Sequence, residues 1–151
     1  MLSLPHALAH AMRRHAERDY PAECCGVLLG RRFTRAGSGV VREVVEVHAC
    51  ANTLAGVSGQ QSYAIAPEEL IAAQRAARER GLDIVGFYHS HPEHPAQPSP
   101  SDIREAYWPD CVYVIVSVAQ RTAREMNAFL AAGEGETRFV PEPIAFEPNA
   151  D

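Results

Sequence analysis

The sequence predicts an α/β fold in which helices alternate with the strands of a central sheet. Two stretches, Asp83–Tyr88 and Asp110–Val118, are apolar on both faces, which is typical of strands covered on both sides. Two other stretches, one near the N-terminus and one after Pro67, place apolar residues at helical spacing. The length of 151 residues fits a single domain, residues 1–151, that buries about 68–70% of the surface its unfolded chain exposes.

The first helix is expected to start at Ser3, a good N-cap residue, and to end between Asp19 and Ala22. His6, His10 and His15 are expected at its surface or boundary. His6 and His10 form an i, i+4 pair, which can bind metal, but no third ligand accompanies them. The apolar stripe of this helix is expected to comprise Leu4, Leu8, Ala11, Met12 and His15.

The remaining elements follow from β-branched runs, turn residues and helix signals. In the first half we expect strands at Gly26–Gly30, Val40–His48 and Ser62–Ile65, a polar hairpin connection at Arg31–Gly39, a loop at Cys50–Gln61 and a helix from Pro67 to Gly81. In the second half we expect a short helix after Ser99, strands at Arg124–Leu130 and Thr137–Ile144, a turn at Gly133–Glu136 and a frayed end at Pro148–Asp151.

Composition excludes several classes of function. The net charge of −5 argues against sequence-independent binding to nucleic acid, which needs a basic surface. No apolar run is long enough to span a membrane, and the N-terminus lacks a signal-peptide pattern, so we expect a cytoplasmic protein. No C-x-x-C pair occurs, which makes a thiolate zinc site unlikely and predicts free, mostly buried thiols at Cys24, Cys25, Cys50 and Cys111.

The stretch from Asp83 to Asp102 carries the chemistry. His89 and His91 lie two residues apart at the end of a buried strand, so that both rings are expected on one face. Two imidazoles on one face can form half of a zinc site, and a catalytic zinc uses three protein ligands and a water. Seven residues separate His91 from Ser99, an N-cap residue for a helix whose third position is Asp102. By itself, S-x-x-D resembles a capping box.

The pattern H-S-H, a seven-residue gap that begins with Pro92, and S-x-x-D resembles the signature of the JAMM (MPN+) metalloprotease family. His89, Ser90, His91, Ser99 and Asp102 match it. Glu23, before the apolar run of Gly26–Gly30, stands where the family places an upstream glutamate. The bacterial members of the CysO-cysteine peptidase type resemble this chain over most of its length. The resemblance implies a cytidine-deaminase-like, three-layer arrangement with a curved mixed β-sheet flanked by helices.

The resemblance also implies roles for these residues. His89, His91 and Asp102 would bind one Zn²⁺ per chain, Glu23 would pass a proton from the zinc-bound water to the leaving amine, and Ser99 would stabilise the oxyanion. Asn52 resembles a position of the bacterial family and is expected to bind substrate. Cys25-Gly26 fits the family pattern and indicates tight packing, and Ser90 is expected to hydrogen-bond locally.

The function implied is a zinc metallopeptidase or isopeptidase that cleaves the amide bond after the C-terminal Gly-Gly of a ubiquitin-like or sulfur-carrier protein. No nucleic-acid or membrane partner is expected. The sequence leaves open whether the chain forms a homodimer. The alternative function is an MPN scaffold that binds metal without turnover.

The motifs of two further classes of metalloenzyme do not fit the chain. The metallo-β-lactamase motif H-x-H-x-D-H nearly matches here, with Glu93 in place of Asp, but it needs histidines downstream and none follows His94. A zinc nucleoside deaminase needs H-x-E together with P-C-x-x-C, and the chain has no P-C-x-x-C. His94 is therefore expected to be a solvated loop residue.

Overall fold

A computed structural model of the chain describes residues 1–56, 62–106, 108–133 and 137–149. The strands form one mixed sheet in the order β7-β6-β5-β4-β2-β3-β1-β8. Their bounds are β1 Leu2–Pro5, β2 Cys25–Arg35, β3 Gly39–Cys50, β4 Asp83–Pro92, β5 Val112–Ala119, β6 Thr122–Ala132, β7 Arg138–Glu142 and β8 Ile144–Glu147. The helices are α1 His6–Asp19, α2 Pro67–Glu79 and α3 Pro100–Arg104.

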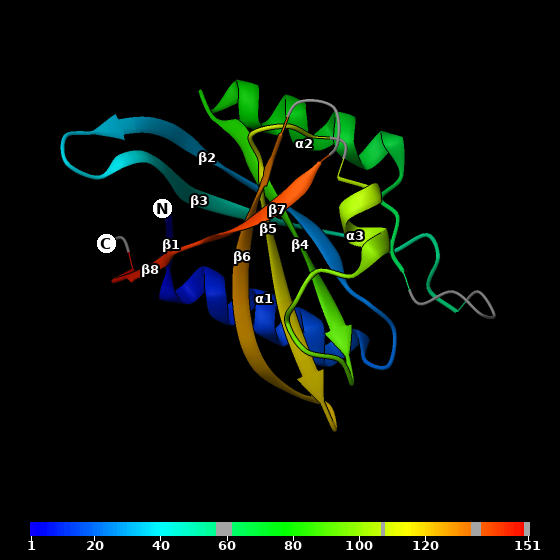
Figure 1. Ribbon diagram of the computed structural model, residues 1–151. Coiled ribbons are helices and arrows are strands. Elements are labelled where there is room, and N and C mark those ends of the chain that lie inside the picture. The colour runs from blue at the N-terminus through cyan, green and yellow to red at the C-terminus, as the bar shows by residue number, and fades with distance from the viewer. Residues whose placement is uncertain (57–61, 107, 134–136, 150–151) are drawn as a thin grey trace.

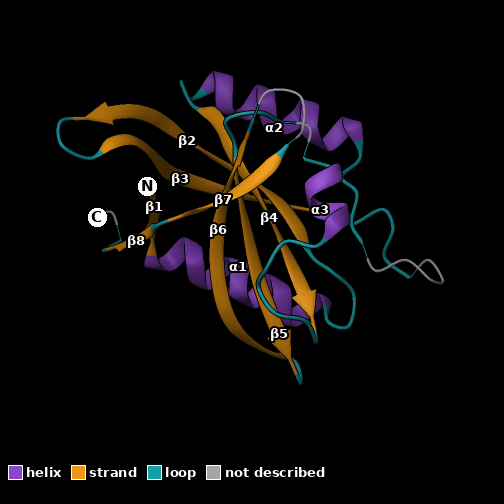
Figure 2. Cartoon of the chain, in the orientation of Figure 1, coloured by secondary structure: helices purple, strands orange, loops and turns teal. Residues whose placement is uncertain are grey.

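The two long helices lie on opposite faces of the sheet, as Figures 1 and 2 show. The core accordingly has two parts. Met12 of α1 belongs to the cluster that includes Tyr88 of β4, and Ala73 of α2 belongs to the cluster that includes Phe87 of β4. Successive side chains of a strand point to opposite faces, so β4 contributes to both parts. The predicted α/β class, with a curved mixed sheet flanked by helices in three layers, is confirmed.

The sheet is curled, and its two edge strands are consecutive in the chain. β7 and β8 are the outermost strands, yet only Pro143 separates them, and Leu2 N donates to Pro143 O at 2.8 Å. The prediction of one strand over Thr137–Ile144 is therefore wrong, because the segment contributes to two strands, β7 and β8. Proline has no N–H group for a strand ladder, and at Pro143 the chain passes from one edge of the sheet to the other.

The N-terminal prediction also needs correction. Ser3 lies in β1, which pairs in parallel with β3 and β8, and α1 begins at His6 with Pro5 in the N-cap position. Leu2 and Leu4 are fully buried, so burial and long-range pairing make this segment a strand.

Within α1, the buried residues are Ala9, Met12, His15 and Ala16. Ala11, expected on the apolar stripe, is exposed, and His15, expected at the surface or boundary, is buried. His6 and His10 are exposed, as expected.

Most central elements match their predicted positions. α1 ends at Asp19, Pro67 begins α2, and Gly81 with φ of 67° follows its end. The strand predicted at Ser62–Ile65 is wrong, because that segment is irregular and is held by side-chain hydrogen bonds instead. The turn predicted at Gly133–Glu136 falls largely outside the described residues.

At the C-terminal end, Pro148 and Asn149 are exposed and irregular, and Asn149 Oδ1 accepts a hydrogen bond from Ala7 N at 2.7 Å. Residues 150–151 lie outside the described part of the chain.

Two further sequence expectations concern packing. All four cysteines are free and buried, as predicted. Gly26 of β2 leaves room for the ring of Tyr88, which a β-carbon at this position would overlap, so the predicted tight packing at Cys25-Gly26 is confirmed. Among the described helices, none has the length and apolar character needed to cross a membrane.

Candidate metal centre and its pocket

The two histidines of the motif come from the end of β4, a central strand between β2 and β5. Because side chains alternate along a strand, His89 and His91 leave the same face of the sheet. His89 is fully buried and His91 is 8% exposed. Their Nε2 atoms lie 3.1 Å apart. The sequence therefore placed this pair of imidazoles correctly.

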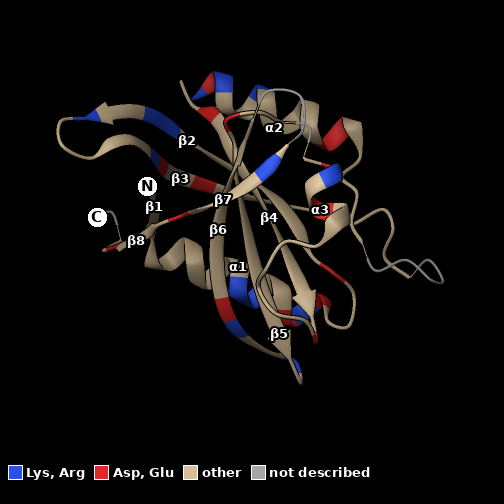
Figure 3. Cartoon of the chain, viewed as in Figure 1, with Lys and Arg blue, Asp and Glu red and all other residues tan. Residues whose placement is uncertain are grey.

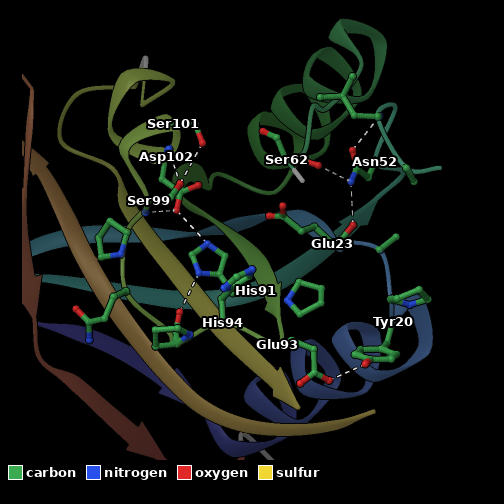
Figure 4. Close-up of a pocket in the computed structure, with 18 of the residues that line it drawn as sticks. Tyr20, Glu23, Asn52, Ser62, His91, Glu93, His94, Ser99, Ser101 and Asp102 are labelled. Carbon is green, nitrogen blue, oxygen red and sulfur yellow. Dashed lines mark hydrogen bonds and ion pairs between the residues drawn. The ribbon is translucent and has the colours of Figure 1, made fainter. Parts of the chain in front are cut away.

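Asp102 comes from α3, which starts where the proline-rich loop ends. Ser99 is the N-cap: its Oγ accepts from Asp102 N at 3.1 Å, and Asp102 Oδ2 accepts from Ser99 N at 2.8 Å. This capping box holds the carboxylate in place. Oδ1 of Asp102 lies 3.2 Å from Nε2 of His89, and Oδ2 lies 3.0 Å from Nε2 of His91 (Figure 4).

The donor atoms of these three side chains fit a bound cation. Nδ1 of His91 lies 2.9 Å from the carbonyl oxygen of Pro95, which can only accept, so Nδ1 carries the hydrogen. In the neutral ring, Nε2 of His91 then presents a lone pair toward the second imidazole and the Asp102 carboxylate. A single proton can bridge only one pair of these atoms, whereas a metal ion can accept electron pairs from all three side chains. Two imidazole nitrogens and a carboxylate are a ligand set that zinc uses.

The electrostatics of the cluster have identifiable causes. Burial alone would raise the pKa of Asp102, but hydrogen bonds with His89 and His91 hold it well below its usual range. Burial lowers the pKa of His89. Burial acts the same way on His91, yet its bonds to Asp102 and to the Pro95 carbonyl raise its pKa overall. The carboxyl group of Asp102 is thus ionised in the cluster.

Glu23 lies two residues before β2, the strand that pairs with β4, and its carboxylate approaches the histidines from there. Ligand atoms of Glu23, His89 and His91 all lie within 4.8 Å of one another. Burial raises the pKa of Glu23 to about 8, while the positive charge on His91 acts in the opposite direction. The structure therefore brings together the upstream glutamate and the motif, which are 66 residues apart in sequence and become neighbours because β2 pairs with β4.

Asn52 lies just after β3 and organises the wall beside Glu23. Its Nδ2 donates to the carbonyl oxygens of Glu23 at 3.0 Å and Ser62 at 3.2 Å. Its Oδ1 accepts from the backbone N–H groups of Leu54 at 2.9 Å and Ala64 at 3.1 Å. Both donors and both acceptors of the amide are therefore used within the protein. Asn52 acts on the pocket through the backbone segments that it holds.

Several side chains that support the site were not singled out from the sequence. The ring of Tyr63 stacks on His89, with centroids 4.6 Å apart, and nothing in the local sequence signals this contact. Ser90 Oγ accepts from Cys24 N at 2.8 Å, so its hydrogen bond links β4 to the residue before β2. The prediction of a local hydrogen bond for Ser90 is therefore wrong. Pro95 could have been suspected, because the stiff proline-rich loop was expected to hold ligands in place.

The side chains border a cavity of about 900 Å³. Glu23, His91, Ser99 and Asp102 line it, while His89 lies beneath. Asn52 and Leu54 also belong to the lining, and Figure 4 shows Asn52 beside Glu23. Glu93 and His94 also line the cavity, and both are exposed, as the sequence predicted for His94. The cavity is open to solvent and has the metal-ligand candidates on its floor.

A curled mixed sheet between two helices, a His-x-His strand end, an aspartate on the next helix and a glutamate before the adjacent strand define a JAMM (MPN+) type of domain. The chain belongs to the family described as prokaryotic homologs of the JAB domain, which it matches over residues 5–146. The resemblance inferred from the motif is thereby confirmed.

Relatives of established name share most of the chain. A desampylase of Haloferax volcanii is 42% identical over 119 residues, covering 78% of this chain and 78% of the relative. A probable TtuB-protein conjugate cleaving protease of Thermus thermophilus is 35% identical over 108 residues, covering 72% and 65%. A CysO-cysteine peptidase of Mycobacterium bovis is 30% identical over 122 residues, covering 81% and 77%.

The fold also has a close counterpart among solved structures. The solution structure of a protein from Desulfitobacterium hafniense superimposes with a TM-score of 0.79 at 28% sequence identity. The superposition covers 99% of this chain and 94% of that one.

Proposed function

We propose that this chain is a zinc-dependent peptidase or isopeptidase. Its substrate is the amide bond after the C-terminal Gly-Gly of a ubiquitin-like or sulfur-carrier protein. The observation that carries the proposal is the convergence of His89, His91, Asp102 and Glu23 at one cavity. The relatives support it, because their names describe a desampylase, a conjugate cleaving protease and a CysO-cysteine peptidase.

One zinc ion per chain would be held by Nε2 of His89, Nε2 of His91 and the carboxylate of Asp102. When bound, zinc supplies a Lewis acid for the scissile carbonyl and lowers the pKa of a water to about 7. The protein contributes the orientation of the ligands. The Pro95 carbonyl fixes the ring of His91, Tyr63 stacks on His89, and the N-cap bond from Ser99 N holds Asp102.

Proton transfer is assigned to Glu23. Its carboxylate is positioned beside the two histidines, where it takes a proton from the attacking water and returns it to the leaving amine. The hydroxyl of Ser99 faces the same cavity. Its oxygen accepts from Asp102 N and contacts Ser101 Oγ at 3.1 Å. With Ser101 as the donor in that contact, the hydrogen of Ser99 is free to donate to the carbonyl oxygen as negative charge develops there.

The wall held by Asn52 is proposed to bind the substrate tail. Asn52 ties the segment from Ser62 to Ala64 to the backbone of Glu23, which places this wall next to the proposed base. A Gly-Gly tail is thin enough to pass along such a wall, because it has no side chains to clash with. The four free buried thiols fit a reducing compartment, so we place this activity in the cytoplasm.

A cleavage assay with mass readout tests the proposal. The zinc-loaded protein is mixed with a β-grasp carrier extended past its Gly-Gly end, with and without a chelator. We expect cleavage directly after the second glycine, and none with chelator. Glu23→Gln should retain zinc and lose about 10²–10⁴-fold in turnover, because the base is gone while the ligands stay. Glu68→Gln, an exposed change on α2, should retain both.

The same assay tests the alternative of a scaffold without turnover. Full zinc occupancy with no cleavage across a panel of carriers would favour the scaffold. Normal turnover of Glu23→Gln would assign proton transfer to another group. If His89→Ala retained zinc, the ligand assignment would be wrong.

A further inference from the structure

A second cavity, of about 500 Å³, lies at the other end of the central strands. Its lining includes Asp83 at the start of β4 and Asp110, two residues before β5. β4 and β5 run in parallel, and the histidines lie at the far end of β4, so this cavity is separate from the proposed catalytic pocket. Residues of β2, β3 and α2 and the segment 108–111 complete it.

Three arginines from three elements line this cavity: Arg32 of β2, Arg42 of β3 and Arg78 of α2. Arg32 and Arg42 are directly opposed in the antiparallel β2–β3 register, so their side chains leave the same face of the sheet. Like charges in directly opposed positions destabilise a sheet. Figure 3 shows positive residues on β2 and α2, in a protein whose net charge is −5.

Arg42 is the buried member of the group, with a side chain that is 4% exposed. Its Nε donates to the carbonyl oxygen of Asp110 at 3.0 Å, and one terminal nitrogen lies 3.8 Å from Glu142. Burying a guanidinium costs free energy unless its charge and its N–H groups are matched. Glu142 matches the charge of Arg42, while Arg32 and Arg78 are exposed and have no such partner among the described residues.

The carboxylates that line the cavity do not balance these charges. Asp83 and Asp110 belong to the lining, but within the described part of the chain neither lies within ion-pair distance of Arg32 or Arg78. Asp110 is held by its backbone oxygen, which Arg42 engages. Three guanidinium groups and two carboxylates line the cavity, and among the described residues Arg42 alone of the three arginines has an ion pair, with Glu142.

We infer that this cavity is a binding site for a small, multiply charged anion. Adjacent phosphoryl or carboxylate oxygens would bridge Arg32, Arg42 and Arg78, because a guanidinium offers paired N–H groups that match both kinds of oxygen. The volume lies within the range of small-molecule sites. The relief of repulsion between Arg32 and Arg42 contributes to the binding. This inference is independent of the proposed peptidase activity.

Trp108 provides the readout, because it lines the cavity and is the single tryptophan of the chain. Its fluorescence is followed while the zinc-loaded protein is titrated with tripolyphosphate or, separately, with tricarballylate, at constant ionic strength. A response to the first probe alone indicates a phosphate ligand, and a response to the second alone indicates a carboxylate ligand.

The variants Arg32→Gln and Arg78→Gln test the site, since both side chains are exposed and can be changed without disturbing the core. We expect a saturable fluorescence change in the wild type at millimolar anion or below. Each variant should raise the apparent Kd by about tenfold or more, because a charge-assisted contact is lost. Arg75→Gln, on the same helix but outside the cavity lining, should bind as the wild type does.

Two outcomes would overturn the inference. One is the lack of any saturable change with both anions. The other is the same change in Arg32→Gln and Arg78→Gln as in the wild type. That second result is the one expected if the anion removes the metal ion at the far end of β4, because such an effect would be the same in every variant.

Discussion

At the scale of single residues, Asp102 joins the local structure of a helix to the proposed metal centre. Its Oδ2 accepts the N–H of Ser99 as part of the capping box, and both of its oxygens face imidazole nitrogens. The sequence left open whether S-x-x-D was a cap or a ligand motif. The structure shows the cap, and the cap is what directs the carboxylate toward His89 and His91.

Asp102→Asn separates the charge of this carboxylate from its capping role. The amide oxygen can still accept from Ser99 N, so α3 should form, but an anionic ligand is lost. Zinc affinity should fall by more than about 100-fold, which exceeds the usual effect of changing a supporting residue around a metal. Elemental analysis after dialysis against buffered zinc measures this. Glu105→Gln, on the next turn, should bind zinc normally, and retention of zinc by Asp102→Asn would contradict the assignment.

Ser99→Gly separates the hydroxyl of Ser99 from its capping role. Glycine is tolerated at an N-cap with a loss of only a few tenths of a kcal/mol, so the melting temperature should change little. Turnover of a cleavable carrier should fall by about 10²–10³-fold, as for loss of an oxyanion donor. The control is Ser101→Ala, because its Oγ lies 3.1 Å from that of Ser99. Normal turnover in Ser99→Gly would leave Ser99 with capping alone.

At the scale of elements, the predictable part of the site is the part encoded locally. His89, His91, Ser99 and Asp102 lie within one strand–loop–helix segment, so alternation and helix capping were enough to place them. The position of Glu23 depends on the pairing of β2 with β4, and the motif resemblance supplied what spacing could not.

The errors share one physical origin. Leu2–Pro5 is a strand because of its partners β3 and β8, and a four-residue segment is too short to show periodicity. Ser62–Ile65 has a strand-like sequence, but Asn52 takes up hydrogen-bonding groups of this segment instead of a neighbouring strand. Long-range contacts decide both cases, and they cannot be read from a local pattern.

Asn52→Asp tests how far this one side chain organises the wall of the pocket. The change keeps the acceptors for Leu54 and Ala64 but removes the donors to the carbonyl oxygens of Glu23 and Ser62. Each buried group left without a partner costs about 1–3 kcal/mol, so chemical denaturation should show a loss in this range or above it. Turnover should fall as well, because the backbone of Glu23 is released.

The control for this wall is Thr53→Val. It removes an exposed hydrogen bond from Thr53 Oγ1 to the carbonyl oxygen of Ala64 in the same wall. Its loss of unfolding free energy should be smaller than that of Asn52→Asp. If the two variants were equally stable, the amide of Asn52 would not be what holds the wall.

At the scale of the whole molecule, α1 and α2 cover opposite faces of the sheet, and the global stability depends on how each helix is fastened. His15 fastens α1. Its Nδ1 lies 2.7 Å from the hydroxyl of Tyr88 in β4, and its Nε2 lies 3.1 Å from Asp19. Burial lowers the pKa of His15 below 6.5, and Arg18 acts in the same direction, while Asp19 acts against them.

This lowered pKa makes the free energy of unfolding depend on pH. Below pH 6.5 His15 becomes protonated in the unfolded chain but stays neutral in the folded chain. The unfolded state then binds more protons, so the free energy of unfolding decreases as the pH is lowered. The contribution is complete above pH 6.5 and is lost toward the folded pKa. His15→Gln removes the titrating group, so its unfolding free energy, from urea denaturation, should fall less than that of the wild type between about pH 7.5 and pH 5.5. All other titrating groups are common to both proteins. Parallel curves over this range would show that His15 titrates alike in both states and that its burial does not contribute to the pH dependence of the fold.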